Sequence, residues 1–180
     1  MSYQALKERH RAERGAWHPN LSLRVHRALS WLDRAEQLGL QNDADGQFIL
    51  LWIAFNAAYA TEIDERFRLS EQETFRAFLT KLVELDAGRK RFEALVWEEF
   101  PKSIRVLLDN KFVFQDFWNF KNGSLPEEEW KRRFAGAKKA AKSALAARDT
   151  VTVLAVVLSR IYTLRNQLVH GGATWNGALN

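Results

Sequence analysis

Apolar residues recur at helical spacing along this chain, and no segment alternates polar and apolar residues for long. A repeat of about 3.6 residues indicates amphipathic helices, whereas a half-buried strand repeats every two residues. Only three prolines occur in 180 residues, at positions 19, 101 and 126. We therefore predict an all-α fold, an up-and-down helical bundle that forms a single domain over residues 1–180.

The stretch Phe48–Phe55 is apolar on nearly all sides, which indicates that a helix of about residues 44–66 lies at the centre of the bundle. Asn56 stands alone in this apolar segment, on the same flank as Trp52 and Tyr59. A buried amide usually has a hydrogen-bond partner, so we expect one for Asn56. Core packing is the expected role of Trp52, with stacking on a nucleic-acid base as the alternative for Trp52 or Tyr59.

Capping residues and breaks predict the other helices. Residues 1–19 form a peripheral basic segment with a charged helix near 5–15, and 173–180 form a flexible tail. We expect a helix to about residue 38, capped by Asn20 or Ser22 and ended by Gly39, and a helix of about 70–86 that starts with a Ser70/Glu73 capping box. A third helix should cover residues 89–100 and end at Pro101. The aromatic-rich insert 104–120 should form short helices, and a further helix should begin at Pro126 with Ser124 as its cap.

The helix from Pro126 carries three glutamates in its first turn and basic residues afterwards. This order of charges is favoured by the helix dipole, so a solvated basic face is the simplest interpretation. An RNA-tracking surface is the alternative. Its candidate residues are Lys131, Arg132, Lys138, Lys139 and Lys142.

The last helix ends in a run of chemically distinctive residues, Arg165 to His170, followed by Gly171 and Gly172. At about 100° per residue, Arg165 projects from within the apolar stripe of this helix, where an unpaired guanidinium is costly. The expected acceptor is a carboxylate partner or an anion that enters a pocket. The stripe consists of Leu154, Val157, Leu158, Ile161, Leu164 and Leu168.

Beside this stripe runs a polar seam of Tyr162, Asn166 and His170, in steps of four residues. The seam ends at His170, and an imidazole titrates near neutrality in general. It lies next to the fixed cation of Arg165, and proton transfer beside a phosphate needs these two kinds of group together. A plainer interpretation exists, because arginine and histidine are common near helix C-termini and Gly171 is an ordinary residue at a helix end.

Composition excludes several classes of function. Cysteine is absent, which rules out disulfides, thiolate nucleophiles and cysteine-based zinc sites. His10, His18 and His26 lie eight residues apart without the spacing of metal ligands, so we expect no metal and no cofactor. No secretory signal is visible and the longest apolar run is shorter than a membrane span, so we expect a soluble cytoplasmic protein. The net charge of +5 suits a polyanionic partner.

With both helices considered, the chain resembles the HEPN superfamily of α-helical domains. The family motif is an arginine, often followed by a polar residue, and then a histidine near the end of the last helix. Arg165, Asn166 and His170 match this motif, and Asn56 matches the polar residue of an earlier core helix that commonly faces it. The apparent helical layout covers roughly residues 20–172.

The resemblance implies a metal-independent endoribonuclease. HEPN domains typically form dimers in which two motifs meet, and many belong to toxin–antitoxin, CRISPR-associated or antiphage systems. By this resemblance Arg165 and His170 are catalytic, whereas Asn166, Asn56, Tyr162 and Tyr59 support or orient. The implied partners are RNA, a second copy bound through the last-helix face, and an antitoxin or defence-system protein. Cleavage by the 2′-OH would leave 2′,3′-cyclic phosphate ends.

Two departures from the family pattern matter. Gly172 occupies the position of the tyrosine that is adenylylated in many HEPN toxins, so regulation by that route is not expected. The aromatic insert is larger than in minimal toxins, which favours the larger defence-associated families. There are two alternatives to a ribonuclease. The first is a non-catalytic HEPN-like module that binds nucleic acid or nucleotide, or that mediates dimerisation. The second is an unrelated helical bundle in which Arg165 pairs with a buried carboxylate of its own subunit.

Overall fold

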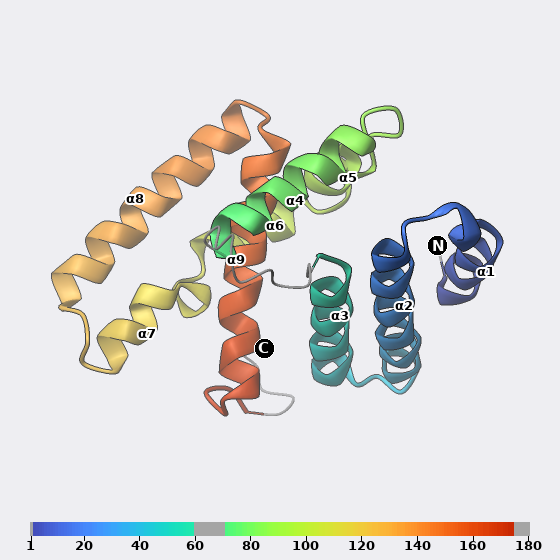
Figure 1. Cartoon of the computed structure of the whole chain (residues 1–180). Coiled ribbons are helices and arrows are strands. Elements are labelled where there is room, and N and C mark those ends of the chain that lie inside the picture. The colour runs from blue at the N-terminus through green and yellow to red at the C-terminus, as the bar shows by residue number, and fades with distance from the viewer. Residues whose placement is uncertain (1, 60–70, 175–180) are drawn as a thin grey trace, which may run out of the picture. The chain divides into compact units, whose positions relative to one another are not determined.

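The computed structural model describes residues 2–59 and 71–174 of the chain. Throughout these ranges every regular element is helical and no strand occurs (Figure 1). The prediction of an all-α helical bundle is confirmed.

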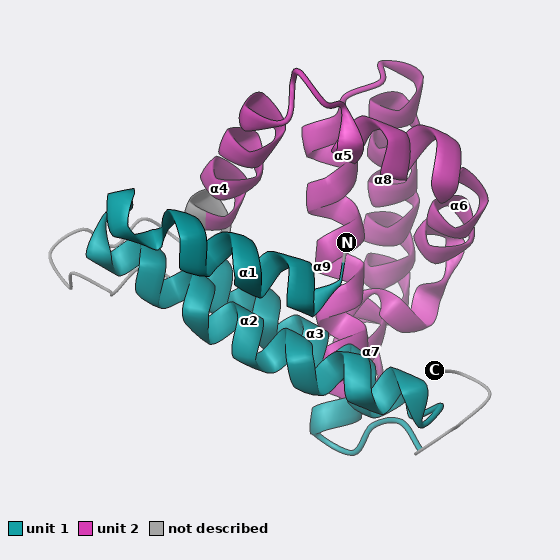
Figure 2. Ribbon diagram, turned by 90° about the vertical axis from the view of Figure 1, so that its right-hand side faces the viewer, with its two compact units in different colours: residues 1–68, 168–180 teal, residues 69–167 magenta. Residues whose placement is uncertain are grey.

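The chain divides into two compact units (Figure 2). Unit 1 comprises residues 1–68 and 168–180, and unit 2 comprises residues 69–167. The boundary near the C-terminus falls inside the last helix, between Gln167 and Leu168.

Unit 1 is built on α1 (Tyr3–Glu13), α2 (Pro19–Leu40) and α3 (Ala44–Tyr59). Helices α2 and α3 lie side by side as a hairpin (Figure 1). The turn between them is tight because Asn42 adopts a left-handed conformation with φ of 58°. The carboxylate of Asp43 then accepts the N–H of Gly46 at 2.9 Å and caps the start of α3.

Helix α1 packs against α2 and is therefore more than the peripheral charged segment predicted for residues 1–19. The side chain of His10 is only 4% exposed, and its Nε2 lies 3.2 Å from Ser22 Oγ. The His10 ring lies 5.4 Å from that of Trp17. The prediction treated α1 as peripheral because the helix lacks an apolar face. His10 provides the buried contact in place of an apolar residue.

The start and end predicted for α2 are wrong. The helix begins at Pro19, and His18 Nδ1 accepts the N–H of Asn20 at 3.3 Å as its cap. Proline at the first helical position costs no hydrogen bond and has the right φ. The helix also continues through Gly39 to Leu40, so Gly39 does not end it.

Unit 2 contains the remaining helices. They are α4 (Glu71–Leu85), α5 (Arg91–Ala94) with a π-helical turn (Leu95–Glu99), α6 (Pro101–Asp109), a 3-10 turn (Lys111–Val113), α7 (Gln115–Lys121), α8 (Glu127–Ala146) and α9 (Thr150–Val169). Their apolar core joins the π-helical turn, α6, α8 and α9. Its buried members are Val96, Ile104, Leu108, Ala141, Ala144 and Val153.

The aromatic insert forms short helices, as predicted, and its rings pack onto α8. Phe117 lies edge-on to Trp130, with ring centroids 5.3 Å apart. The helical segment before Pro101 ends at Glu99, close to the predicted stop, and Pro101 also begins α6. The cap predicted for α8 is wrong, because Ser124 Oγ donates to Asn119 O at 2.8 Å and does not cap the helix. Ser70 of the predicted capping box and the end of the helix predicted for 44–66 lie outside the described residues.

Candidate functional site at the end of the last helix

Helix α9 has defined signals at both ends. Asp149 caps its start, because Oδ1 accepts the Thr152 N–H at 3.0 Å and Oδ2 accepts the Thr152 hydroxyl at 2.6 Å. These hydrogen bonds lower the pKa of Asp149. At the other end Gly171 has φ of 72° and its N–H approaches Leu168 O at 3.4 Å. The glycine ends the helix in the way that its position in the sequence predicts.

Arg165 is half-buried and has no carboxylate partner among the described residues. Its Nη1 donates to Asn166 Oδ1 at 2.8 Å, and its Cζ lies 5.9 Å from the centroid of the Tyr162 ring. A guanidinium has five N–H donors, so a neutral amide oxygen leaves its charge and most of its donors uncompensated. The carboxylate pairing expected of an unrelated bundle is absent from the described part of the chain.

The most buried side of α9 differs from the one that the apolar stripe indicated. The stripe residues, and Arg165 among them, are half-buried. The residues of α9 that are almost fully buried are Val153, Arg160 and Thr163, at 2%, 5% and 3% exposure. The deeply buried arginine of this helix is therefore Arg160, whereas Arg165 on the apolar stripe is half-buried.

His170 directly follows the last residue of α9 and its side chain is exposed. Its exposure leaves the imidazole accessible to a ligand. His170 therefore meets the first requirement of a proton-transfer group, which is access to the reacting atoms.

The same end of α9 presents large apolar groups to solvent. Tyr162 and Val169 are 43% and 47% exposed. They are seven residues apart and so lie close to one line along the helix. They give this side of the helix end two exposed apolar side chains beside the polar motif.

The polar residue of the earlier helix, Asn56, lies on α3. Its Oδ1 is buried and has no hydrogen-bond partner. Trp52 is buried, as predicted, and its ring and that of Tyr59 both pack against Phe55, at 5.7 and 5.4 Å. Asn56 and Tyr59 belong to unit 1 whereas Arg165 belongs to unit 2, and the prediction that they face one another stays a prediction.

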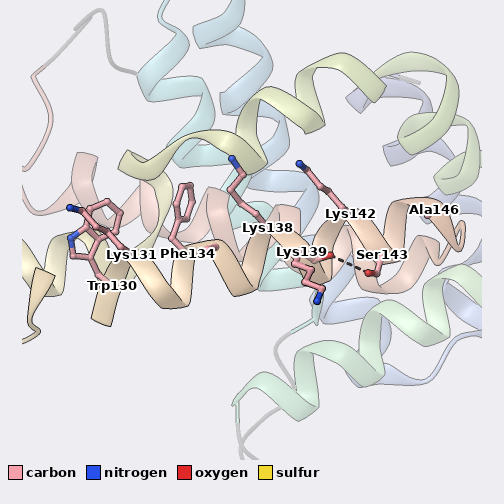
Figure 3. A pocket seen from close by; sticks show the side chains of 9 residues that line it. Trp130, Lys131, Phe134, Lys138, Lys139, Lys142, Ser143 and Ala146 are labelled. Atoms are coloured by element: carbon pink, nitrogen blue, oxygen red, sulfur yellow. Dashed lines mark hydrogen bonds between the residues drawn. The ribbon is translucent and has the colours of Figure 1, made fainter. Parts of the chain in front are cut away.

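Four of the five basic residues predicted to bind RNA line one open groove of about 680 Å³ along α8 (Figure 3). These are Lys131, Lys138, Lys139 and Lys142. The fifth, Arg132, is not part of the lining and makes an ion pair of 2.7 Å with Glu129. The structure thus gathers these lysines but does not test what they bind.

Sequence reasoning missed Arg160, the most unusual side chain of α9. Its guanidinium Cζ lies 4.3 Å from the Phe114 ring centroid and 5.6 Å from that of Phe134. Its Nε is buried without an acceptor, and burial lowers the pKa of the group. No sequence signal marks this residue, because its two aromatic neighbours come from distant segments.

The described residues contain no cluster of three or more histidine, aspartate or glutamate side chains that is able to hold a metal ion. Within the same ranges, none of the helices combines the length and the hydropathy needed to cross a bilayer. No protein-family model, curated protein or solved structure matches the chain.

Proposed function

We propose that the chain is a metal-independent endoribonuclease of the HEPN type that acts as a homodimer, with Arg165 and His170 as its catalytic residues. The observation that carries the proposal is the state of Arg165. It is a half-buried guanidinium whose one hydrogen bond within the described part of the chain goes to the amide of Asn166. A fixed cation without a carboxylate among the described residues, about one and a half turns from an exposed histidine, suits a phosphate that becomes more negative as it reacts.

The chemistry assigns a role to each group. A base takes the proton from a ribose 2′-OH, whose oxygen attacks phosphorus. The bond from phosphorus to O5′ breaks, and an acid delivers a proton to the departing O5′. The products are a 2′,3′-cyclic phosphate and a 5′-hydroxyl, so atoms and charge balance without a metal.

One histidine in each motif cannot serve as both base and acid at the same moment. Two copies joined through the exposed face of α9 that carries Tyr162 and Val169 supply two His170 side chains. Dimerisation is then part of the mechanism. Asn166 holds Arg165 through the hydrogen bond between them. Asn56 and Tyr59 keep the supporting roles that the family resemblance implies. A toxin–antitoxin or antiphage setting, with a neutralising or activating partner, fits this activity.

The test is cleavage of a mixed pool of structured and single-stranded RNA in excess EDTA. Wild type is compared with His170→Ala and with His26→Ala, which removes an exposed histidine of α2. We expect cyclic phosphate ends from wild type and His26→Ala, and a rate lower by about 10² to 10⁴ for His170→Ala. Equal rates for His170→Ala and wild type would remove His170 from the mechanism.

A folded, dimeric wild type that binds RNA without cutting it would support the second candidate, a non-catalytic nucleic-acid-binding module. The basic groove along α8 is the observation that favours this second candidate.

A further inference from the structure

The groove along α8 has a row of lysines on one side of the helix. This row begins at Lys131, and Lys138 and Lys142 follow seven and eleven residues after it. At 100° per residue, both lie within about 20° of a line drawn along the helix through Lys131. The row extends over about 16 Å of the helix axis at 1.5 Å per residue. Figure 3 shows Lys138 and Lys142 projecting from the same side of α8 as Phe134. A row of this length suits an extended anion better than a compact one.

The lysines in the C-terminal half of α8 are not neutralised by their own helix. From Phe134 to Ala146, α8 carries three lysines and no acidic residue. Lys139 and Lys142 form no ion pair with any described residue, whereas Lys138 is bound by Asp109. The lysine lowers the pKa of that carboxylate through a hydrogen bond. The N-terminal half differs, because Lys131 pairs with Glu127 at 2.7 Å.

The aromatic part of the groove contains buried donors without acceptors. Trp130 lines the groove, is 8% exposed, and has a buried Nε1 without a hydrogen-bond partner. Phe134 lines the groove as well and lies 6.2 Å from Trp130. Beside Phe134 lies Arg160, whose Nε also lacks an acceptor. Native buried donors are nearly always paired, so the two orphans in and behind the groove mark its aromatic end as a place where the protein supplies too few acceptors.

We propose that this groove binds single-stranded RNA, with the phosphates on Lys138, Lys139 and Lys142 and a base against the aromatic end at Phe134. A nucleic-acid strand combines evenly spaced anions with apolar faces, and a basic row beside aromatic rings is the usual surface for it. Arg160 is a positioning residue, since its uncompensated charge lies behind Phe134 and raises the potential of the groove. The identity of the strand as RNA rests on the proposed function.

The test measures binding by the full chain carrying His170→Ala, so that the probe is not cut. The probe is a fluorescein-labelled single-stranded RNA of 12 nucleotides, with the duplex of the same sequence and an inorganic polyphosphate of equal charge as competitors. The variant is the triple change Lys138→Gln, Lys139→Gln and Lys142→Gln. The matched control changes Lys81, Lys90 and Lys102 to Gln, which are exposed lysines of unit 2 outside the groove.

We expect the groove variant to bind RNA roughly tenfold more weakly or worse, and the control variant to bind within about twofold of the parent. The slope of log affinity against log salt should fall by about 2, because each phosphate on a single strand contributes about 0.7. Equal losses in both triple variants would overturn the groove as the binding surface. If polyphosphate binds as tightly as RNA, the proposal that the groove recognises single-stranded RNA is wrong. The groove would then be a general anion-binding surface.

Phe134→Leu keeps an apolar side chain and removes the ring. We expect this variant to lose the preference for single-stranded RNA over polyphosphate while it keeps its salt dependence. Circular dichroism establishes that it is folded, and an unchanged preference in folded protein would contradict base stacking.

The proposed function and this inference fail separately. If wild type cuts RNA and the groove variant cuts it with unchanged kcat and KM, the groove proposal is wrong and the endoribonuclease stands. If wild type never cuts RNA but binds it through the α8 lysines, the endoribonuclease proposal is wrong and the groove stands.

Discussion

The arginines of α8 and those of α9 have opposite environments. On α8, Arg132 and Arg133 both bind Glu129, one turn earlier on the same helix, at 2.7 Å. On α9, Arg160 and Arg165 have no carboxylate among the described residues, and their contacts are aromatic rings and one amide. The α8 arginines are neutralised by a glutamate of their own helix. The charges of the α9 arginines are not neutralised by any carboxylate among the described residues, which leaves them available to bind an anion.

This difference separates charges that are neutralised within their own helix from candidate functional ones. An exposed pair at i, i+3 or i, i+4 has little energetic consequence, because water screens both partners. A buried or half-buried guanidinium without an anion carries a desolvation cost in the folded state. An unpaired arginine of this kind lowers stability but holds a defined position, so it is a candidate for binding a ligand.

The largest expected effect separates Arg165 from Arg132. Arg165→Gln should lower the rate of RNA cleavage by about 10² to 10³, the usual loss when one donor to a developing negative charge is removed. Arg132→Gln removes the same charge from α8 and should leave the rate within about twofold of wild type. Single-turnover cleavage in EDTA measures both, and losses of the same size would end the distinction between the two helices.

The second prediction concerns the buried guanidinium. Arg160→Met removes a desolvated charge and keeps the volume against Phe114 and Phe134, so the free energy of unfolding should stay equal or rise by about 1 kcal/mol. Arg160→Lys puts a strongly hydrated ammonium in the same place and should lower it by about 2 kcal/mol. Urea unfolding gives both values. A large loss for Arg160→Met would mean that the stacking on the two rings outweighs desolvation.

A smaller effect is expected at the start of α9. Asp149→Ala removes the cap and should lower the free energy of unfolding by about 1 kcal/mol at pH 7. Because the folded-state pKa of Asp149 is depressed, its contribution is complete above the unfolded pKa of about 3.9 and is lost as pH falls through the folded pKa. Wild type and variant should therefore converge in stability under strongly acidic conditions. A gap that persists at low pH would assign the effect to the helix backbone instead of the carboxylate.

The smallest effect is predicted for Glu129→Gln, which leaves Arg132 and Arg133 without their shared partner. We expect no measurable change in the unfolding midpoint in moderate salt, because these groups are exposed and water replaces the ion pair. Thermal unfolding at low and moderate salt checks this expectation. A marked drop at both salt concentrations would show that the α8 ion pairs are structural.

The helical elements could be predicted because their signals are local. The periodicity of α9, its end at Gly171 and the short helices of the aromatic insert all follow from neighbouring residues. Caps were harder, since several residues compete for the same backbone N–H. His18 caps α2 where Asn20 and Ser22 looked suitable, because Pro19 as the first helical residue starts the helix two residues before a cap at Asn20 would. The candidate motif was visible in the sequence, although the state of each side chain was not.

Arg165 and Arg160 show where the limit lies. The sequence alone determined that α9 is a helix, that both arginines lie on it, and that Arg165 falls on its apolar stripe. Only the tertiary structure decided that Arg160 is the buried one, because Phe114 and Phe134 reach it from α7's leading loop and from α8. Periodicity reports which side of a helix is apolar, whereas burial depends on which other segments arrive there, and those contacts join residues far apart in the chain.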